Sequence, residues 1–442
     1  MKKIILLFVI FSSAISFGQW SYVSNIPGFA NINCISVVDQ NLIWACGDSR
    51  AVCRTTNGGV NWVTRNNGLP STSINSISAL DTTLCWIGTV TGSIYNTTDG
   101  GNSWTLQFSI AGSFSNGIKM FDQNYGLYYG DPTGAGQPHQ WRYTINGGAN
   151  WLLSTDAPIA PANEYGLLNA WDWIDTGRIW IATGNLVSGA TTARILKTLN
   201  GFRGGGWTPA PLTGTGNSDG LYFSSIAFTD ANNGMAACNG SGNAIRKTTD
   251  GGNNWTVVTN PPGLSNFIPF NMCGLKDGSN LVFAFIYTNT NYCVRTSDFG
   301  VTWVNEPLPT QAQTGSLRLM KFVNSSLGYA GGFNGVFLRY GNSIGISQIN
   351  SEIPTGYVLG QNYPNPFNPS TKINFSLPRS SDVTIRIYNG IGKEVETLIN
   401  EFKPAGNYSV DYTAAPGLTS GVYFYSLTAN DFRATKKLMI VK

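Results

Sequence analysis

An eight-residue motif that recurs along the first three quarters of the chain constrains its fold more than any other feature. The first two copies read TTNGGVNW (residues 55–62) and TTDGGNSW (residues 97–104). The remaining copies cover residues 144–151, 198–207, 248–255 and 296–303, the copy at 198–207 being stretched by glycines. Internal repeats at this spacing indicate an array of similar supersecondary units, and a chain of 442 residues can hold such an array and a smaller domain.

Each residue type in the motif has a local physical role. The third residue is Asp or Asn, whose side-chain oxygen can accept backbone N–H bonds inside a tight turn, and the glycines can take a positive φ. The final Trp opens the next strand and packs inward. Where Asn57, Asn146 and Asn200 replace Asp, the amide oxygen can still accept these bonds, so we expect those turns to form as well.

A second periodic mark precedes each motif, and it occurs seven times. It is a polar residue that follows an apolar run and opens a short turn: Asp39, Asp81, Asp122, Asp175, Asp230, Asp277 and Asn324. The spacings are close to the length of one four-stranded propeller blade, which predicts seven blades. The last repeat lacks the motif and the strand that its Trp would open, so we expect residues 19–23, which begin Gln-Trp, to close the ring as its outer strand.

The motif resembles the Asp box, Ser/Thr-x-Asp-x-Gly-x-Thr-Trp, of sialidase-like propellers, sortilin-type receptors, xyloglucanases and photosystem assembly-factor-like propellers. This resemblance implies a fold but no particular activity. The expected fold class is all-β, a seven-bladed Asp-box β-propeller followed by a small C-terminal β-sandwich. Abundant Gly and aromatic residues, with only 11% charged residues, agree with many short strands and tight turns.

The C-terminal region begins with the segment YPNPFNPST and continues as short alternating runs separated by turn residues. The expected strands are 373–377, 383–388, 408–412, 422–427 and 437–441. YPNPFNPST, IRIYNGIGKEV, GNYSV, SGVYFYSL and KKLMIVK closely resemble the type A sorting domain of the type IX secretion system of Bacteroidetes. The resemblance implies as partners the secretion machinery and a sortase that removes the domain. The alternative is a carbohydrate-binding or fibronectin-like sandwich attached to an enzyme.

The N-terminus has the pattern of a secretory signal peptide, with Lys2 and Lys3 before an apolar run and small residues near position 18. The expected parts are therefore a signal peptide (1–18), a propeller (19–343), a linker (344–356) and a sorting domain (357–442). The protein would be secreted or attached to the outer cell surface, after Sec-type export to the periplasm. We expect a monomer without a membrane span.

Composition argues against several partners and cofactors. The formal charge is +4, and about half of it lies in the leader, so no basic surface for nucleic acid or anionic membrane is expected. Seven scattered cysteines without CxxC spacing, and a single His139, predict no metal site and no cofactor. We expect His139 to be an exposed loop residue. Most cysteines are expected to be buried core thiols, although Cys46 and Cys53 could pair across a hairpin.

Once the repeat positions are assigned, few carboxylates remain for acid–base chemistry. The best candidates for a catalytic pair are Asp131, Glu164 and Asp172, and a glycosidase would need two of them facing each other. Nearby aromatic rings are suited to stacking on sugars, and the candidate ligand-binding residues are Tyr129, Trp141, Trp171 and Trp173. The alternative is that these rings only pack between blades. The Arg-Ile-Pro signature of sialidases is absent.

These observations favour a non-catalytic surface or secreted protein that binds a glycan or another protein. The runner-up is a polysaccharide-active glycoside hydrolase that resembles the xyloglucanase propellers. A third possibility is a rigid scaffold with a structural or adhesive role. Whether the three candidate carboxylates converge beside Trp171 or Trp173 distinguishes the first two hypotheses.

Overall fold

The fold is described from a computed structural model of the chain. It defines residues 20–185, 187, 192–199, 206–213, 221–239, 245–259, 261, 268–287, 290–313, 317–325, 327–341, 346–350, 354–414 and 418–441. The expected signal peptide, residues 1–18, lies outside these residues, as does Asn200 of the stretched motif. The chain divides into two compact units, one comprising Gln19–Tyr340 and the other containing Gly341–Lys442.

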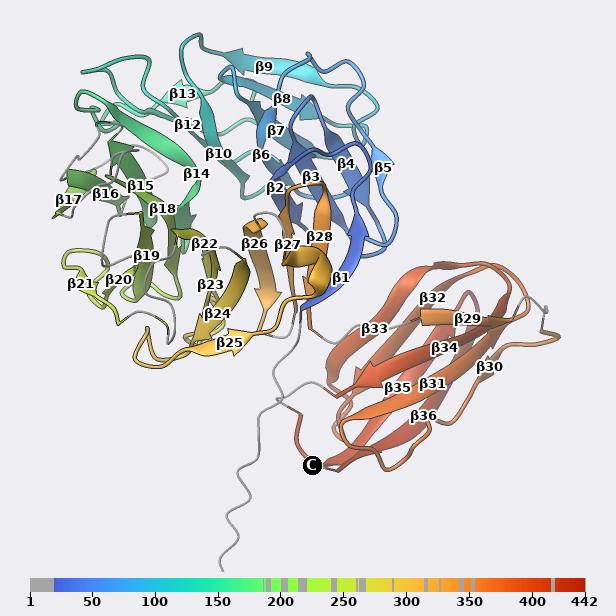
Figure 1. Cartoon of the computed structure of the whole chain (residues 1–442). Coiled ribbons are helices and arrows are strands. Elements are labelled where there is room, and N and C mark those ends of the chain that lie inside the picture. Colours follow the sequence, from blue (N-terminus) through green and yellow to red (C-terminus); the bar gives the residue numbers. More distant parts are fainter. Residues whose placement is uncertain are drawn as a thin grey trace, which may run out of the picture. The chain divides into compact units, whose positions relative to one another are not determined.

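The first unit is a β-propeller, in which antiparallel sheets are arranged radially around a central cavity (Figure 1). The first three sheets each have four strands in chain order. Their strands are β2 (Ile32–Val37), β3 (Ile43–Gly47), β4 (Val52–Thr55) and β5 (Val63–Thr64); β6 (Ile74–Ala79), β7 (Cys85–Thr89), β8 (Ser93–Thr97) and β9 (Thr105–Ser109); and β10 (Ser115–Met120), β11 (Gly126–Gly130), β12 (Gln140–Thr144) and β13 (Leu152–Leu153).

The middle of the propeller is one eight-stranded sheet, because β15 pairs with β18 as well as with β14 and β16. Its strands are β14 (Glu164–Trp173), β15 (Ile179–Asn185), β16 (Thr192–Thr198), β17 (Thr208–Thr213), β18 (Leu221–Phe228), β19 (Gly234–Cys238), β20 (Ile245–Thr248) and β21 (Thr256–Val257). A four-stranded sheet follows, made of β22 (Ile268–Gly274), β23 (Val282–Tyr287), β24 (Asn291–Thr296) and β25 (Val304–Glu306). The 3-10 turn Thr310–Ala312 is the one helical element among the described residues.

The last sheet of the propeller joins the two ends of this unit. It contains β26 (Leu317–Asn324), β27 (Leu327–Gly332) and β28 (Val336–Tyr340), and its outer strand is β1 (Trp20–Asn25). Trp20 lies opposite Tyr340, and its indole N–H donates to the Cys293 thiol at 3.2 Å. The pairing predicted for the segment that begins at Gln19 is therefore confirmed from Trp20 onward.

The repeated motif forms the turn between the third and fourth strands of a sheet. In the first copy the Asn61 N–H donates to the Asn57 side-chain oxygen at 2.9 Å, and the Gly59 N–H donates to Thr55 Oγ1 at 3.0 Å. The same bonds recur around Asp99, Asn146, Asp250 and Asp298. The expectation that Asn can replace Asp is confirmed at residues 57 and 146.

The second periodic mark opens the turn between the first and second strands. Asp39 accepts the N–H groups of Asn41 and Leu42, at 2.7 and 2.8 Å. Asp81, Asp122, Asp175 and Asp230 accept the equivalent pair of bonds, and Asp277 accepts one of them. These carboxylates are structural, as their repeat positions predicted.

The propeller core consists of separate apolar layers between neighbouring sheets. One layer contains Trp44, Ile77 and Ile87, and another contains Trp20, Phe283 and Leu338, all nearly inaccessible to solvent. Burial of such side chains stabilises each by about 1.5–3 kcal/mol. None of the seven cysteines, all among the described residues, forms a disulfide, and five are buried, so most are core thiols as expected. Cys46 lies opposite Val52 and is not bonded to Cys53.

The second unit is a β-sandwich of two four-stranded sheets. One sheet has β29 (Ile346–Asn350), β30 (Val358–Leu359), β31 (Ser370–Leu377) and β34 (Gly406–Thr413), and the other has β32 (Ser381–Tyr388), β33 (Glu394–Lys403), β35 (Gly421–Ala429) and β36 (Phe432–Ile440). Alternating residues such as Ile373, Ile385 and Leu427 form its core. β29 lies within the expected linker and pairs with β34, and it has only two apolar residues to signal a strand.

Candidate functional site

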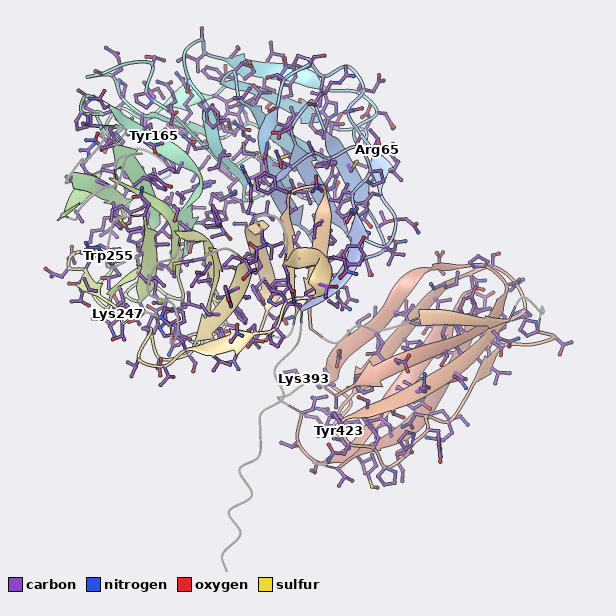
Figure 2. The ribbon with its side chains drawn as sticks, viewed as in Figure 1. Arg65, Tyr165, Lys247, Trp255, Lys393 and Tyr423 are labelled. Atoms are coloured by element: carbon purple, nitrogen blue, oxygen red, sulfur yellow. The ribbon has the colours of Figure 1, made fainter. Side chains whose placement is uncertain are left out.

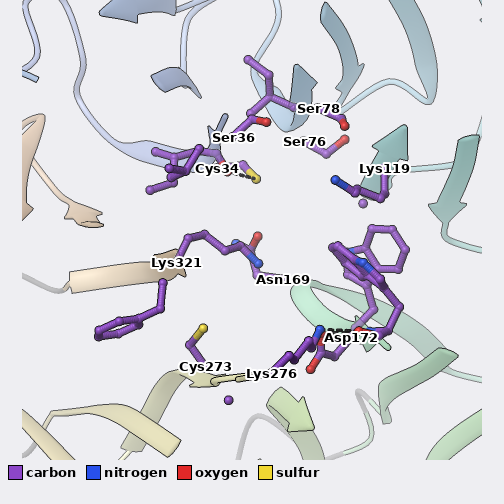
Figure 3. Close-up of a pocket in the computed structure, with 18 of the residues that line it drawn as sticks. Cys34, Ser36, Ser76, Ser78, Lys119, Asn169, Asp172, Cys273, Lys276 and Lys321 are labelled. Carbon is purple, nitrogen blue, oxygen red and sulfur yellow. Dashed lines mark hydrogen bonds and ion pairs between the residues drawn. The ribbon is translucent and has the colours of Figure 1, made fainter. Parts of the chain in front are cut away.

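A central cavity of about 440 Å³ is the candidate functional site of the propeller. It is lined by the innermost strand of each four-stranded propeller sheet, namely β2, β6, β10, β22 and β26, and by β14 and β18 of the eight-stranded sheet. Ligand sites are commonly cavities of ~300–1,000 Å³ with a few polar groups pointing inward. Figure 3 shows such groups, including Lys119, Asp172, Lys276 and Lys321.

Side chains around the cavity connect one inner strand to the next. Ser36 Oγ accepts the Ala79 N–H at 2.9 Å, and Ser78 Oγ accepts the Met120 N–H at 2.9 Å. Both serines stand three residues before a repeat aspartate. In each case the donor is a backbone N–H group of the following inner strand. The serine hydroxyl provides this buried N–H group with an acceptor.

Asp172 occupies the same repeat position and makes the same bond. Its Oδ2 accepts the Phe228 N–H of β18 at 2.7 Å, and its Oδ1 accepts the Trp173 N–H at 2.9 Å. Lys276 Nζ lies 2.6 Å from Oδ1, so the carboxylate is also ion-paired. Asp172 therefore has a structural role that the sequence did not reveal, because two other repeats use Ser where this one uses Asp.

Asp131 and Glu164 lie away from Asp172 and are not among the residues that line the cavity. Glu164 lies opposite Asn185 and Asp172 lies opposite Trp180, positions five residues apart on β15, which at ~3.3 Å per residue is roughly 17 Å. Asp131 is close to the Glu164 end, since it accepts the Gly166 N–H at 2.7 Å. Among the three candidates, the structure thus brings together Asp131 and Glu164 but not Asp172.

Glu164 forms a buried cluster with a histidine and an arginine. Its Oε1 lies 2.9 Å from His139 Nε2, and its Oε2 accepts a bond from Arg194 Nε at 2.6 Å. Burial raises the pKa of Glu164, but the bonds from His139 and Arg194 outweigh it and hold this pKa below its usual range. The expectation that His139 is an exposed loop residue is wrong: it is fully buried, because Glu164 provides a polar partner inside the fold.

Asp131 is held mainly by neutral donors. Asn116 Nδ2 donates to its Oδ1 at 2.7 Å, in addition to the Gly166 N–H. Burial raises the pKa of Asp131, since desolvation disfavours the charged form more than these bonds favour it. A raised carboxyl pKa is a property of general acids, but Asp131 does not line the central cavity.

The four candidate aromatic residues differ in their access to solvent. Tyr129 and Trp141 are fully buried, with ring centroids 6.2 Å apart, and neither has a face open to a ligand. Trp171 lines the cavity but is 7% exposed, and it packs so closely on Gly117 that a Cβ there would lie 2.2 Å from its indole nitrogen. Trp173 lines the cavity and is only half-buried. Of the four candidate aromatic residues, it is therefore the one that can present a ring to a ligand in the cavity.

Three lysines around Trp173 are cavity residues that the sequence did not single out. Their Nζ atoms lie over the Trp173 ring, at 5.8 Å for Lys119, 5.2 Å for Lys276 and 5.9 Å for Lys321. Burial and the charges of Lys321 and Lys276 lower the pKa of Lys119. Lys119 and Lys321 stand three residues before a repeat mark, the position of Asp172, so repeat alignment could have identified them.

A group of asparagines occupies a second level of the inner strands. They stand six residues before a repeat aspartate and are Asn33, Asn75, Asn116, Asn169 and Asn271. Asn169 Nδ2 donates to the Asn33 carbonyl at 3.1 Å, joining β14 to β2 although the two are far apart in sequence. Asn116 is 2% exposed and lines the cavity, and its Oδ1 has no hydrogen-bond partner within the described structure.

The proline-rich segment of the sandwich is organised around one buried asparagine. Asn362 Nδ2 donates to the Pro364 carbonyl and to Thr371 Oγ1, each at 3.0 Å. Its N–H donates to Tyr425 Oη at 2.9 Å, and Phe367 enters the sandwich core. The motif YPNPFNPST thus caps the core of this unit.

Comparison with known proteins identifies the second unit. Residues 361–441 match the family described as secretion system C-terminal sorting domain. The chain therefore ends in a sorting domain that interacts with the type IX secretion machinery, and the protein is delivered to the cell surface or the extracellular space. No helix among the described residues is long and apolar enough to cross a membrane.

Solved structures resemble the chain in fold. YCF48 bound to D1 peptide is 19% identical, with a TM-score of 0.55 over 74% of this chain and 98% of that one. YCF48 from Cyanidioschyzon merolae is 18% identical, with a TM-score of 0.54 over 73% and 98%. The GH74 enzyme of Niastella koreensis is 12% identical, with a TM-score of 0.51 over 96% and 75%. A search of curated protein sequences finds no match.

These comparisons define the class of protein as an exported, nearly all-β chain with a propeller and a C-terminal sorting domain. At such low identities the structural matches show the fold alone. Within the described residues, no group of three His, Cys, Asp or Glu side chains could hold a metal ion.

Proposed function

We propose that this protein is a non-catalytic binding propeller whose central cavity receives part of an extracellular glycan or surface protein. The observation that carries the proposal is the state of the cavity's two carboxylates. Asp172 accepts two backbone N–H groups and pairs with Lys276, while Asp277 accepts the Ser279 N–H in its own turn. Both are already engaged as structural acceptors, whereas a glycosidase needs a facing acid and base.

We further propose that the propeller belongs to the Asp-box type and has seven blades. The Thr and Asp or Asn bonds of the motif support the first part. The eight-stranded sheet supports the second, because β14–β17 and β18–β21 each repeat the four-strand order of the other sheets, and among the described residues their strands pair only at residues 184–185 and 221–222. Blade seven would then be closed by β1.

We also propose how the exported chain is processed. Residues 1–18 would be a signal peptide, residues 344–356 would connect the two domains, and a surface sortase would remove the domain 357–442. The propeller would be a monomer after release. Mass spectrometry that identifies the first and last residues of the mature protein tests removal of the signal peptide and removal of the sorting domain.

Hydrolysis and binding must be measured on the same preparation to test the proposed function. Exported protein is incubated with a panel of plant and bacterial polysaccharides and with outer-membrane protein extracts, and both reducing-end release and retention are followed. We expect retention of at least one ligand without release of reducing ends. Hydrolysis that Asp172→Asn abolishes would overturn the proposal in favour of a glycoside hydrolase, and hydrolysis lost in Asp131→Asn or Glu164→Gln would do the same.

A further inference from the structure

The central cavity holds more positive charge than its carboxylates neutralise. Lys119, Lys276 and Lys321 converge on the single ring of Trp173, although like charges in a confined space repel one another. Only Lys276 has a carboxylate partner, Asp172. Among the described residues, Lys119 and Lys321 form no ion pair with a carboxylate within 4.0 Å.

The ammonium groups of both lysines lie over aromatic rings. Lys119 Nζ also lies 6.0 Å from the Phe121 ring centroid. A cation–π contact provides no hydrogen-bond acceptor, whereas a charge-assisted hydrogen bond from an ammonium group to an anion is stronger than a neutral hydrogen bond. An anion between Lys119 and Lys321 would therefore relieve their repulsion and provide the acceptors that the rings cannot.

From this arrangement we propose that the central cavity binds an acidic sugar, a pyranose bearing a carboxylate or sulfate group. The anionic group lies between Lys119 and Lys321, and the apolar face of the sugar packs on Trp173. This inference rests on the proposed function and adds the chemical class of the ligand. Figure 3 shows Lys119 and Lys321 on separate strands around the same space.

The rest of the lining favours a sugar over a peptide. Beside the indole, the cavity is lined by Asn169, whose partly exposed side-chain amide can exchange hydrogen bonds with sugar hydroxyls (Figure 3). An aromatic face beside amide groups matches the alternation of C–H and O–H surfaces on a pyranose. A cavity of about 440 Å³ has room for a terminal sugar unit and excludes a long polymer segment.

Isothermal titration calorimetry of the mature protein tests this proposal with four defined probes. They are trigalacturonate, a sulfated galactose oligosaccharide, neutral galactotriose and a hexaglutamate peptide. We expect the double variant Lys119→Met/Lys321→Met to bind the acidic sugar at least about tenfold more weakly. The control is Lys247→Met, because Lys247 lies on β20 outside the cavity lining (Figure 2).

The outcomes separate this inference from the proposed function. If either acidic sugar binds, and the double variant weakens this binding while the control does not, the result supports both the acidic-sugar inference and the proposed binding function. The acidic sugar that binds more tightly then shows whether the anionic group is a carboxylate or a sulfate. If neutral galactotriose binds as tightly as the acidic sugars and the double lysine variant does not change the affinity, the ligand is not an acidic sugar. The protein would then still be a glycan-binding propeller. If hexaglutamate binds more tightly than the sugars, the claim that the ligand is a sugar is wrong. The same conclusion follows if none of the four probes binds while the protein retains a protein partner.

Discussion

The carboxylate of Asp172 accepts the backbone N–H of Phe228 at 2.7 Å, the same contact that Ser78 makes with Met120 in another part of the propeller. One side chain thus connects neighbouring inner strands and, through Lys276, also limits the positive charge of the cavity. One of the three candidate catalytic carboxylates is thus explained by its repeat position.

This equivalence predicts different effects for two substitutions of Asp172. Asp172→Ala removes the acceptor and should lower the free energy of unfolding by about 1–3 kcal/mol, the cost of a buried N–H without a partner. Asp172→Ser supplies the acceptor used by Ser36 and Ser78, so most of this loss should be absent. Urea unfolding measures both, and Ser78→Ala is the matched control. Equal destabilisation by Ala and Ser would contradict the structural role.

The Asp172→Ser variant should also change the binding of an anionic ligand in the cavity. Asp172→Ser leaves Lys276 without its carboxylate, so the positive charge of the cavity increases. Binding of an acidic sugar should therefore become tighter, and the gain should shrink as salt concentration rises. Titrations at low and high ionic strength check this, and weaker binding by Asp172→Ser at low salt would contradict it.

The buried cluster of Glu164, His139 and Arg194 should contribute strongly to stability. Glu164→Gln leaves the Arg194 guanidinium without its charge partner, and we expect a loss of about 2–3 kcal/mol in the free energy of unfolding. Because the pKa of Glu164 is lowered on folding, its contribution is present above the unfolded pKa and is lost as the pH falls through the folded value. Urea unfolding at several pH values measures both effects, with the exposed Glu394→Gln as control; an unchanged stability of Glu164→Gln would contradict the assignment.

The motif turns should make the propeller sensitive to acid in a narrow range. Hydrogen bonds from Asn254 to Asp250 lower its pKa to about 2, and for Asp298 the bonds of Thr302 outweigh burial and lower it to about 2. An unfolded Asp titrates near ~3.9, so stability should fall as the pH decreases from about 4 toward 2. Asp250→Asn should keep the turn, as Asn57 does, but reduce this fall.

Unfolding curves between pH 6 and pH 2 test the acid response. The reverse variant, Asn57→Asp, is the control and should steepen the loss of stability in acid, because it adds a carboxylate to an equivalent turn. A pH profile that neither substitution changes would show that these turns do not control the acid response.

Closure of the propeller by its N-terminal strand predicts a large effect of one residue. Trp20 is 2% exposed and packs against Phe285 and Tyr340, with ring centroids 5.5 and 5.2 Å away. Trp20→Ala should cost about 3–5 kcal/mol, whereas Tyr22→Ala on the exposed side of β1 should cost far less. Thermal unfolding of the two variants compares them directly, and similar melting temperatures would contradict a closing role for β1.

Local patterns in the sequence predicted much of the fold, but not the contacts between repeats. The turns at Asp39 and Asp99 use donors within four residues, so composition and spacing were sufficient to predict them. The pairing of β1 with β28 followed from the strand missing in the last repeat. β33 was missed because its charged residues, among them Glu394 and Glu396, obscure the alternation of apolar residues.

The candidate site was harder to predict because its residues act across the cavity. Asp131 and Glu164 looked available for chemistry, but partners distant in sequence, such as Arg194, occupy them in the fold. Burial of Tyr129 and Trp141 could not be read from aromatic density alone. The cluster of Lys119, Lys276 and Lys321 arises only when three separate repeats meet at one ring.

A crystal structure of the mature protein after prolonged incubation with trigalacturonate tests the central claim most directly. The account predicts an intact sugar in the central cavity, with its carboxylate within hydrogen-bonding distance of Lys119 and Lys321 and its ring on Trp173. Cleaved sugar beside Asp131 or Glu164, or intact sugar bound outside the cavity, would contradict it.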